Sequence, residues 1–399
     1  MSDETVELID GESATETELD DGISLGAPSL RAALEALLMV TEEPMSTSTL
    51  ATLTRTPEDT VLTTLHDLAQ EYIGFSTLQE AGVESANSPN SKSVSSGKKM
   101  WDHYDKTIGT PLRTWALEHI APSPGGTVFY PFSGPDFVTV SQIFPKADRF
   151  ILAAIQPAGP PVDTKTLPEA EVQAFKSKFL SEWVKFGQLG FFRTIDLNEN
   201  TGSATARLTS TPVLMAFAAA LGYRVQSVVP LEFNKVNGEY EPQEISPTAQ
   251  WNSVRLRLSR DARDVVLDYI CIDLSDGGLK SKSPERAWIE MTAKNPVLLK
   301  AASHLLPDPY FTACRAAIVN GAPLLIQDET GLDYADLKKI GDVKLYGRFA
   351  GVHKLFKQQQ PELVAAYAEA GQNTLPLPFA YSYQKSAERR SMQVVRRSP

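Results

Sequence analysis

The hydrophobic pattern of residues 28–83 predicts three short helices followed by a strand. Apolar residues recur every three or four positions up to Pro44, which places them on one stripe of a first helix. Ser46 is suited to cap a second helix, and Thr56 and Pro57 are suited to begin a third. The leucines expected to face inward are candidate partner-binding residues: Leu30, Leu34, Leu37, Leu62 and Leu65. Three helices and a strand are the plan of a winged helix, here a partial one because no second wing strand follows.

From residue 100 onward, two kinds of apolar segment alternate. Short runs bounded by glycine, proline or charged residues predict strands, and longer segments with helical spacing predict helices. The predicted strands are 127–130, 149–155, 223–233, 252–260, 264–276, 322–330 and 343–351. The predicted helices are 101–120 (a pair), 167–187, 210–222, 295–306 and 310–321. This alternation predicts an α/β domain with a mixed sheet flanked by helices.

The arginine-rich end of the chain, residues 387–399, contains no long apolar segment. We expect a frayed basic tail there. Contact with the acidic N-terminal module or with another polyanion is the alternative.

Polar residues gather where three of the predicted strands end. They are Ser133 and Asp136 after the first strand, Asp273, Ser275 and Asp276 in the fifth, and Gln327, Asp328 and Glu329 in the sixth. Ligands of open α/β sheets bind beyond the carboxyl ends of the strands, so these residues are ligand-binding candidates. Tyr130, Arg193 and Arg348 could join them. Several carboxylates with an arginine suit a polar ligand or a cation. The alternative is that each residue caps a helix or closes a turn.

Charge divides the chain into two unlike parts. Residues 1–83 hold 17 acids and two bases, whereas residues 84–399 hold 32 acids and 36 bases. Residues 1–22 alone hold nine acids and no base. The composition therefore predicts a disordered acidic tail (1–27), the helical module (28–83), a serine-rich linker (84–99) and the α/β domain (100–399). A module this acidic is not expected to bind DNA directly, because phosphate contacts need lysine and arginine.

The amino-acid sequence of the first module resembles that of a known family. The segments LRAALEALLMVTEEPMSTSTLATL and TPEDTVLTTLHDLAQEY, over about residues 20–82, resemble the N-terminal winged-helix part of segregation and condensation protein B (ScpB). The resemblance implies a cytoplasmic, often dimeric adaptor without a catalytic site. Such an adaptor binds the kleisin subunit of the bacterial SMC condensin complex and supports chromosome condensation, chromosome segregation and cell division.

The amino-acid sequence of the large domain also resembles that of a protein family. GGTVFYPFSGPDF, ICIDLSDGGLK and YFTACRAAIVNGAPLLIQDETGL resemble an uncharacterised bacterial α/β protein family, across residues 100–399. That family implies no chemistry. A natural fusion or a rearranged gene would each explain the join of the two parts.

Catalytic and metal-binding motifs are absent from the sequence. There is no GxSxG, GxxxxGK[ST] or GxGxxG motif, and the five histidines and two cysteines lack metal-binding spacing. The first predicted strand, the glycine-containing turn after it and the second predicted strand are compatible with a methyltransferase. In that case an acidic residue that binds the ribose would be expected at the end of the second strand, where this chain has Gln156. We therefore predict no metal and no cofactor.

Two functions of different classes remain. The first is a non-catalytic ScpB-like adaptor, with a kleisin and an SMC complex as partners and a homodimer possible. The alternative is an enzyme or polar-ligand-binding protein whose function lies in residues 100–399. No apolar run is long enough for a membrane span and the N-terminus lacks a secretory pattern, so we expect a cytoplasmic protein.

Overall fold

The computed structural model describes part of the chain. The described residues are 99–120, 126–162, 168–189, 208–243, 250–349, 351, 360–379 and 390–397. The predicted acidic tail, helical module and almost all of the linker lie outside them, as do the five candidate partner-binding leucines and Arg193. Those predictions therefore stay predictions.

The described residues form an α/β fold, as the sequence predicts. In chain order, the strands are β1 (Thr127–Pro131), β2 (Arg149–Ala154), β3 (Arg224–Asn234), β4 (Glu239–Pro242), β5 (Ser253–Arg260), β6 (Arg263–Cys271), β7 (Val297–Leu299), β8 (Leu324–Gln327), β9 (Val343–Gly347) and β10 (Ser391–Arg396). The α-helices are α5 (Thr110–His119), α6 (Phe137–Ile143), α7 (Glu169–Leu189), α9 (Ser210–Ala220), α10 (Pro284–Thr292), α11 (Thr312–Gly321), α12 (Tyr334–Ile340) and α13 (Pro361–Ala370). Shorter helical turns are η2 (Asp105–Gly109), η3 (Ala301–Leu305), η4 (Pro309–Phe311) and η5 (Gly371–Asn373).

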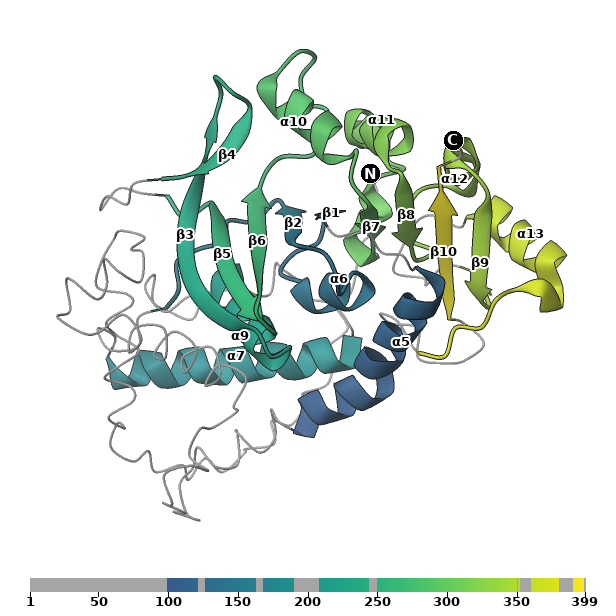
Figure 1. The fold of residues 1–399 in the computed structure, drawn as a ribbon. Helices are drawn as coiled ribbons and strands as arrows, with labels where there is room; N and C mark the ends of the chain where they lie inside the picture. The colour runs from purple at the N-terminus through teal and green to yellow at the C-terminus, as the bar shows by residue number, and fades with distance from the viewer. Residues whose placement is uncertain are drawn as a thin grey trace, which may run out of the picture.

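All the described strands belong to one mixed sheet. Its order is β4-β3-β5-β6-β2-β1-β7-β8-β10-β9 (Figure 1). The five central strands, β6-β2-β1-β7-β8, are parallel to one another. The strands at both ends, β4-β3-β5 and β10-β9, are added antiparallel. From β1 the chain first builds outward through β2 to β6 and later returns to place β7 on the other side of β1. The strand order therefore reverses between β1 and β7, which is the topological switch point of a doubly wound sheet.

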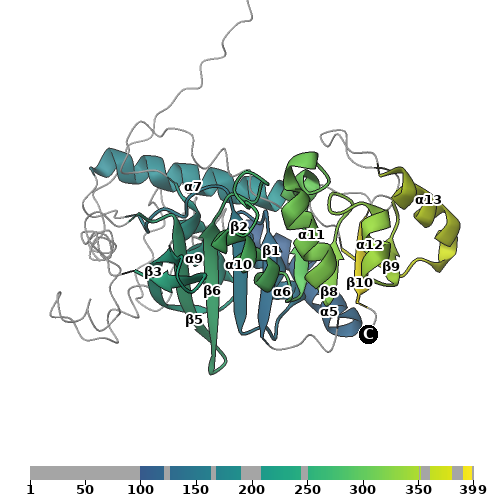
Figure 2. The same ribbon diagram turned by 90° about the horizontal axis from the view of Figure 1, so that it is seen from above.

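Helices cover both faces of this sheet because the strands carry apolar side chains on both. One face packs with α5, α6, α7 and α9, whose core residues include Trp115, Phe137, Trp183 and Phe217. The other face packs with α10, α11 and α12. Figure 2 shows α7 running along one long side of the molecule, and Figure 1 shows α7 below the strands with α10 and α11 above them. Among the described residues, no helix is long and apolar enough to cross a membrane.

Two sequence predictions are wrong. Residues 295–306 were expected to be a helix, but Val297–Leu299 form β7 and Ala301–Leu305 form the 3₁₀ turn η3. The spacing of the apolar residues allows either structure, and pairing with β1 and β8 on both sides decides for the strand.

The C-terminal segment is also not a frayed tail. Ser391–Arg396 form β10, which pairs with β8 on one side and β9 on the other. The guanidinium groups of Arg396 and Arg397 donate to backbone carbonyl oxygens of the domain, including that of Ile120. Its arginines therefore anchor a buried strand.

Candidate functional site

Lys300 is the centre of a buried polar network at the switch point. Its side chain is 2 % exposed, and Nζ donates to Asp136 Oδ2 at 2.7 Å and to Thr139 Oγ1 at 2.8 Å. The Tyr130 hydroxyl donates to the same Asp136 oxygen at 3.2 Å. Lys300 directly follows β7, whereas Tyr130 lies in β1 and Asp136 follows it. The network therefore joins the carboxyl ends of the two strands that flank the switch point.

A sharp turn between β1 and α6 brings Asp136 to this position. Phe132 and Gly134 have positive φ values of 57° and 54°, so the chain reverses within a few residues of the strand end. Asp136 then caps α6, because its Oδ1 accepts from the backbone N–H of Thr139 at 3.1 Å. One carboxylate thus satisfies the helix N-terminus with one oxygen and the Lys300 ammonium with the other.

Asp328, at the end of β8, continues the network on the other side of β7. Its Oδ2 accepts from the backbone N–H of Ala301 at 3.2 Å, and its Oδ1 accepts from the backbone N–H of Thr330 at 2.9 Å. Ala301 has a φ of 53°, a left-handed conformation that costs free energy for any residue but glycine. Burial raises the pKa of Asp328 above its ordinary value, although these hydrogen bonds and the nearby charge of Lys300 oppose the rise.

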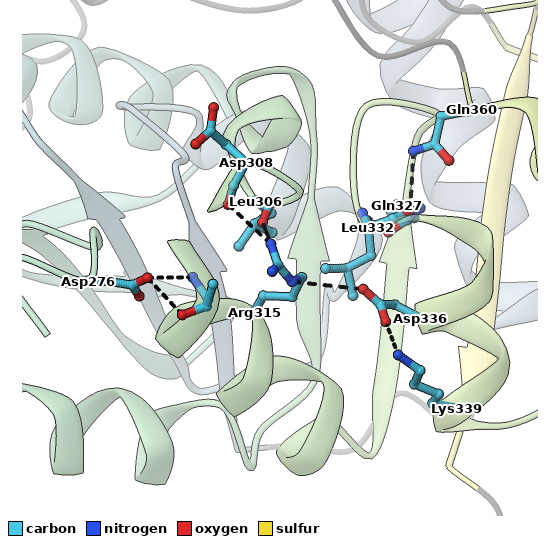
Figure 3. A network of polar contacts seen from close by, with 10 residues as sticks. Asp276, Leu306, Asp308, Arg315, Gln327, Leu332, Asp336, Lys339 and Gln360 are labelled. Carbon is cyan, nitrogen blue, oxygen red and sulfur yellow. Dashed lines mark hydrogen bonds and ion pairs between the residues drawn. The ribbon is translucent and has the colours of Figure 1, made fainter. Parts of the chain in front are cut away.

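Buried polar residues continue from Asp328 toward β10. Glu329 is 2 % exposed and its Oε2 accepts from Ser391 Oγ at 2.8 Å. Gln327 donates to the backbone oxygen of Leu332 at 3.0 Å and lies within 3.3 Å of Gln393 Oε1. The same backbone oxygen accepts from Gln360, as Figure 3 shows. We call Tyr130, Asp136, Thr139, Lys300, Asp328, Glu329 and Thr330 the switch-point network.

Asp276 lies outside this network and caps a helix. Its carboxylate accepts from the backbone N–H groups of Thr312 and Ala313 at 3.2 and 2.8 Å, and from the Thr312 hydroxyl at 2.7 Å. Figure 3 shows it against the start of α11. Desolvation works against the charged form. Even so, these hydrogen bonds and the charge of Arg315 hold the pKa of Asp276 below its ordinary value. Asp276 is therefore a helix cap, which is the alternative to ligand binding that the sequence allows for strand-end acids.

The other predicted residues have local roles or lie farther along the edge. Asp273 is exposed, and its Oδ1 accepts from the backbone N–H of Ser275 in a turn. Ser133 closes the turn after β1, where its backbone N–H donates to the oxygen of Ala153 at 3.1 Å. Arg348 follows β9, the outermost strand at that end of the sheet, and is exposed. The structure therefore brings together Tyr130, Asp136 and Asp328, but gives no contact that joins Asp273, Asp276 or Arg348 to them.

Sequence reasoning missed the residue on which the network depends. The apolar spacing predicts a helix over residues 295–306, in which Lys300 would lie on a solvated face. Thr139 was also missed, because it lies inside an apolar segment. The signal that existed was a lone lysine directly after three apolar residues, VLLK.

A groove elsewhere in the domain contains none of these residues. It has a volume of about 570 Å³ and lies between α12, β9 and α13. Its lining consists of Tyr334, Lys338, Leu345, Glu362, Ala365, Ala366, Glu369 and Ala370. We place the candidate site at the switch point, because the groove lacks the buried charges found there.

The chemistry of the switch-point network is that of hydrogen bonding and charge. Its three carboxylates accept hydrogen bonds, and its ammonium and hydroxyl groups donate them. Within the described part of the chain, no group of His, Cys, Asp and Glu residues has the arrangement of a metal site. Comparison with protein families, with curated proteins and with solved structures finds no match for this chain.

Proposed function

We propose that the α/β domain binds a small polar molecule at the carboxyl ends of β1, β7 and β8. The supporting observation is where the domain buries charge. Six acidic or basic side chains are buried among the described residues, and four of them belong to the switch-point network: Asp136, Lys300, Asp328 and Glu329. Burying charge costs free energy unless it is compensated, and such groups cluster at functional sites. The carboxyl edge at a switch point is also where doubly wound sheets bind ligands.

The balance of charge indicates the class of ligand. The network holds three carboxylates and one ammonium group. Ligand groups that donate hydrogen bonds or carry positive charge would offset the excess of carboxylate, whereas a phosphate would add to it. The ligand class that fits is therefore a molecule with hydroxyl or amino groups, such as a nucleoside, a sugar or an amine.

The strand order adds a fold-level analogy. If the β3-β4-β5 addition is left out, the order is β6-β2-β1-β7-β8-β10-β9, with β10 antiparallel. Methyltransferases that use S-adenosylmethionine share this order, and that molecule carries ribose hydroxyls and amino groups. The residues fit less well, because Gln156 follows β2 and provides no carboxylate for a ribose. The analogy thus supports the place of binding and not a cofactor, and we derive no reaction from it.

Ligand-induced stabilisation of the full chain tests this proposal. Nucleosides, S-adenosylmethionine, sugars and amines are added in turn, and the midpoint of urea unfolding is measured. A ligand at 100 times its Kd stabilises the folded state by about 2.7 kcal/mol. Asp136→Asn keeps an oxygen that can cap α6 but removes the charge, so it is expected to reduce the shift. Asp264→Asn, at an exposed position of β6, is the matched control.

The outcomes separate clearly. A shift caused by one class of compound, reduced by Asp136→Asn and kept by Asp264→Asn, supports the proposal. If no hydroxyl- or amine-bearing compound shifts the midpoint, or if both variants respond equally, the switch-point network is a structural element and the proposal is wrong.

A second function, binding of a kleisin by the N-terminal module, rests on the sequence resemblance alone. It stays a prediction, because residues 28–83 lie outside the described residues. Purification of the full chain from its own source, followed by mass spectrometry of the partners, tests it. Kleisin and SMC subunits should co-purify with the full chain and be lost when residues 28–72 are deleted. Their absence from the full-chain sample would remove the adaptor hypothesis.

A further inference from the structure

Four arginines lie on one face of the sheet, away from the switch point. Arg255 and Arg257 lie two residues apart on β5 and therefore point to the same side of the sheet. Arg257 is paired in register with Ser227 of β3, and Arg224 lies on the same side of that strand. Arg149, at the start of β2, is the fourth. We call Arg149, Arg224, Arg255 and Arg257 the arginine face.

A buried carboxylate fixes two of these arginines. Asp268 of β6 is 0 % exposed, and its Oδ2 accepts from Arg149 Nη2 at 2.6 Å and from Arg255 Nη2 at 2.9 Å. The Nε atoms of both arginines donate to the same carboxylate, at 2.8 and 2.6 Å. One negative charge thus holds two positive charges side by side, which leaves an excess of positive charge on the sheet surface.

The other two arginines add to this excess. Arg224 and Arg257 are exposed, and neither forms an ion pair with any carboxylate of the described residues. Asp264 is the other acid that this face carries, and it lies opposite Ser259. Glu239 of β4 also acts on Arg255 through its charge. The face therefore keeps exposed cations in a chain whose overall net charge is −11.

We propose that the acidic segment of residues 1–22 of this same chain docks on the arginine face. The segment has nine acids and no base, so its charge is complementary to the face. The positions between the arginines are Ser227, Val229, Ser259 and Val266. These provide no aromatic ring on which a nucleic-acid base would stack, which favours an acidic peptide over single-stranded nucleic acid.

The tether makes a weak contact sufficient. The predicted linker of residues 84–99 alone can span up to about 50 Å when extended, so it leaves the segment a wide range of positions. A tethered segment has an effective concentration of the order of millimolar. Exposed ion pairs contribute only about 0.2–1 kcal/mol each, and several acting together on a tethered segment are enough to hold it in place.

Zero-length cross-linking of the full chain tests the contact. A carbodiimide joins carboxylates to amines, so the variant Arg257→Lys makes the arginine face reactive while keeping its charge. We expect cross-links between position 257 and acids of residues 1–22, at least five times more often than from the exposed Lys282, which lies just before α10. They should be lost in 0.5 M salt, which screens exposed charges. Cross-links within one chain keep their yield when the protein is diluted, whereas cross-links between two copies become rarer.

A second measurement does not depend on the new lysine. A labelled peptide of residues 1–22 is titrated into the full chain whose own nine acids in that segment are changed to amides. Arg224→Ser with Arg257→Ser removes two exposed charges and leaves the Asp268 pairs intact, and we expect binding to weaken about five-fold. The control Arg286→Ser on α10 should leave it unchanged. Equal cross-linking from positions 257 and 282, or equal peptide binding by both variants, would overturn the proposal.

Discussion

Removing the ammonium group of Lys300 should destabilise the domain more than any exposed substitution. In Lys300→Met, a side chain of similar length replaces the lysine, and Asp136 stays buried at 1 % exposure without its cation. The Tyr130 hydroxyl and the Thr139 N–H remain as donors, but neither carries a charge. Breaking a buried ion pair by removing one partner costs about 3–5 kcal/mol. Because domains are stable by about 5–15 kcal/mol, a substantial part of the total would be lost.

A double variant distinguishes loss of the ion pair from loss of packing. Asp136→Asn keeps the oxygen that caps α6 and nearly the same volume, but leaves Lys300 without its counter-charge. If the pair is the cause, the double variant should lose at least about 2 kcal/mol less than the two single losses added together. If the losses simply add, the packing of each side chain is the cause and the ion-pair argument fails.

Urea unfolding followed by tryptophan fluorescence measures these differences. Lys282→Met is the matched control, because Lys282 is exposed and such substitutions change stability by no more than about 0.5 kcal/mol. A loss below about 1 kcal/mol in Lys300→Met would refute the reasoning, since Asp136 would then be compensated without the lysine.

Three more predictions use other parts of the domain. Ala262 has a φ of 59° in the turn between β5 and β6, so Ala262→Gly should stabilise the domain by about 0.5–1 kcal/mol in the same urea assay. Burial raises the pKa of the Cys314 thiol to about 12, so iodoacetamide at pH 8 should modify it only after unfolding, as mass spectrometry would show. The third prediction concerns two carboxyl groups with opposite pKa shifts. Desolvation is outweighed at Asp276 by hydrogen bonds that hold its pKa below 3.8, so its stabilisation is lost as the pH falls through the folded-state pKa. The stability gap between the wild type and Asp276→Ala should therefore narrow in acid. Burial raises the pKa of Asp328 above 3.8, so its contribution falls as the pH rises through the folded-state pKa. The stability of the wild type minus that of Asp328→Asn should therefore be greater near pH 4 than at pH 7. If the stability difference between the wild type and one of these two variants does not change with pH, the pKa shift given for that carboxyl group is wrong.

The sequence predicts the central strands where local signals are strong. The strands predicted at 127–130 and 149–155 are β1 and β2 within one residue, because each is an apolar run that ends at proline or near it. The strand β7 has three residues, which are too few to show a strand periodicity, although Pro296 directly precedes it. Its structure is decided by hydrogen bonds to β1 and β8, which no local pattern contains.

The strand β10 shows the same limit at the end of the chain. Two arginines precede the segment SMQVV and two follow it, which suggests a solvated tail. In the structure, Met392 and Val394 join the core on one face and Val395 joins it on the other. A buried strand in an arginine-rich segment is possible because the arginine side chains reach carbonyl oxygens of neighbouring elements.

Half of the candidate site followed from the sequence, and the reason is geometric. Asp136 and Asp328 were predicted because parallel strands place their carboxyl ends on one edge of a sheet. Lys300 is 164 positions from Asp136, and only the position of β7 beside β1 brings the two together. Asp276 was predicted on the same grounds but caps α11, since strand-end acids serve helix capping as well as ligand binding.

The domain compensates its buried carboxylates in two different ways, and the difference bears on function. Asp268, in the middle of β6, is held by two arginines that together donate four hydrogen bonds to it. Asp328, at the carboxyl edge, accepts from two backbone N–H groups and a threonine hydroxyl, and no cation in the described part of the chain donates to it directly. Burial raises the pKa of Asp328 in spite of these hydrogen bonds and the nearby charge of Lys300, so its charged form is less well compensated than in water. The arginines around Asp268 show that a buried carboxylate in this domain can be compensated by guanidinium groups, and Asp328 is compensated less fully. The under-compensated carboxylate lies where the strand order reverses, so a ligand that donates a hydrogen bond or brings a positive charge there would supply the missing compensation.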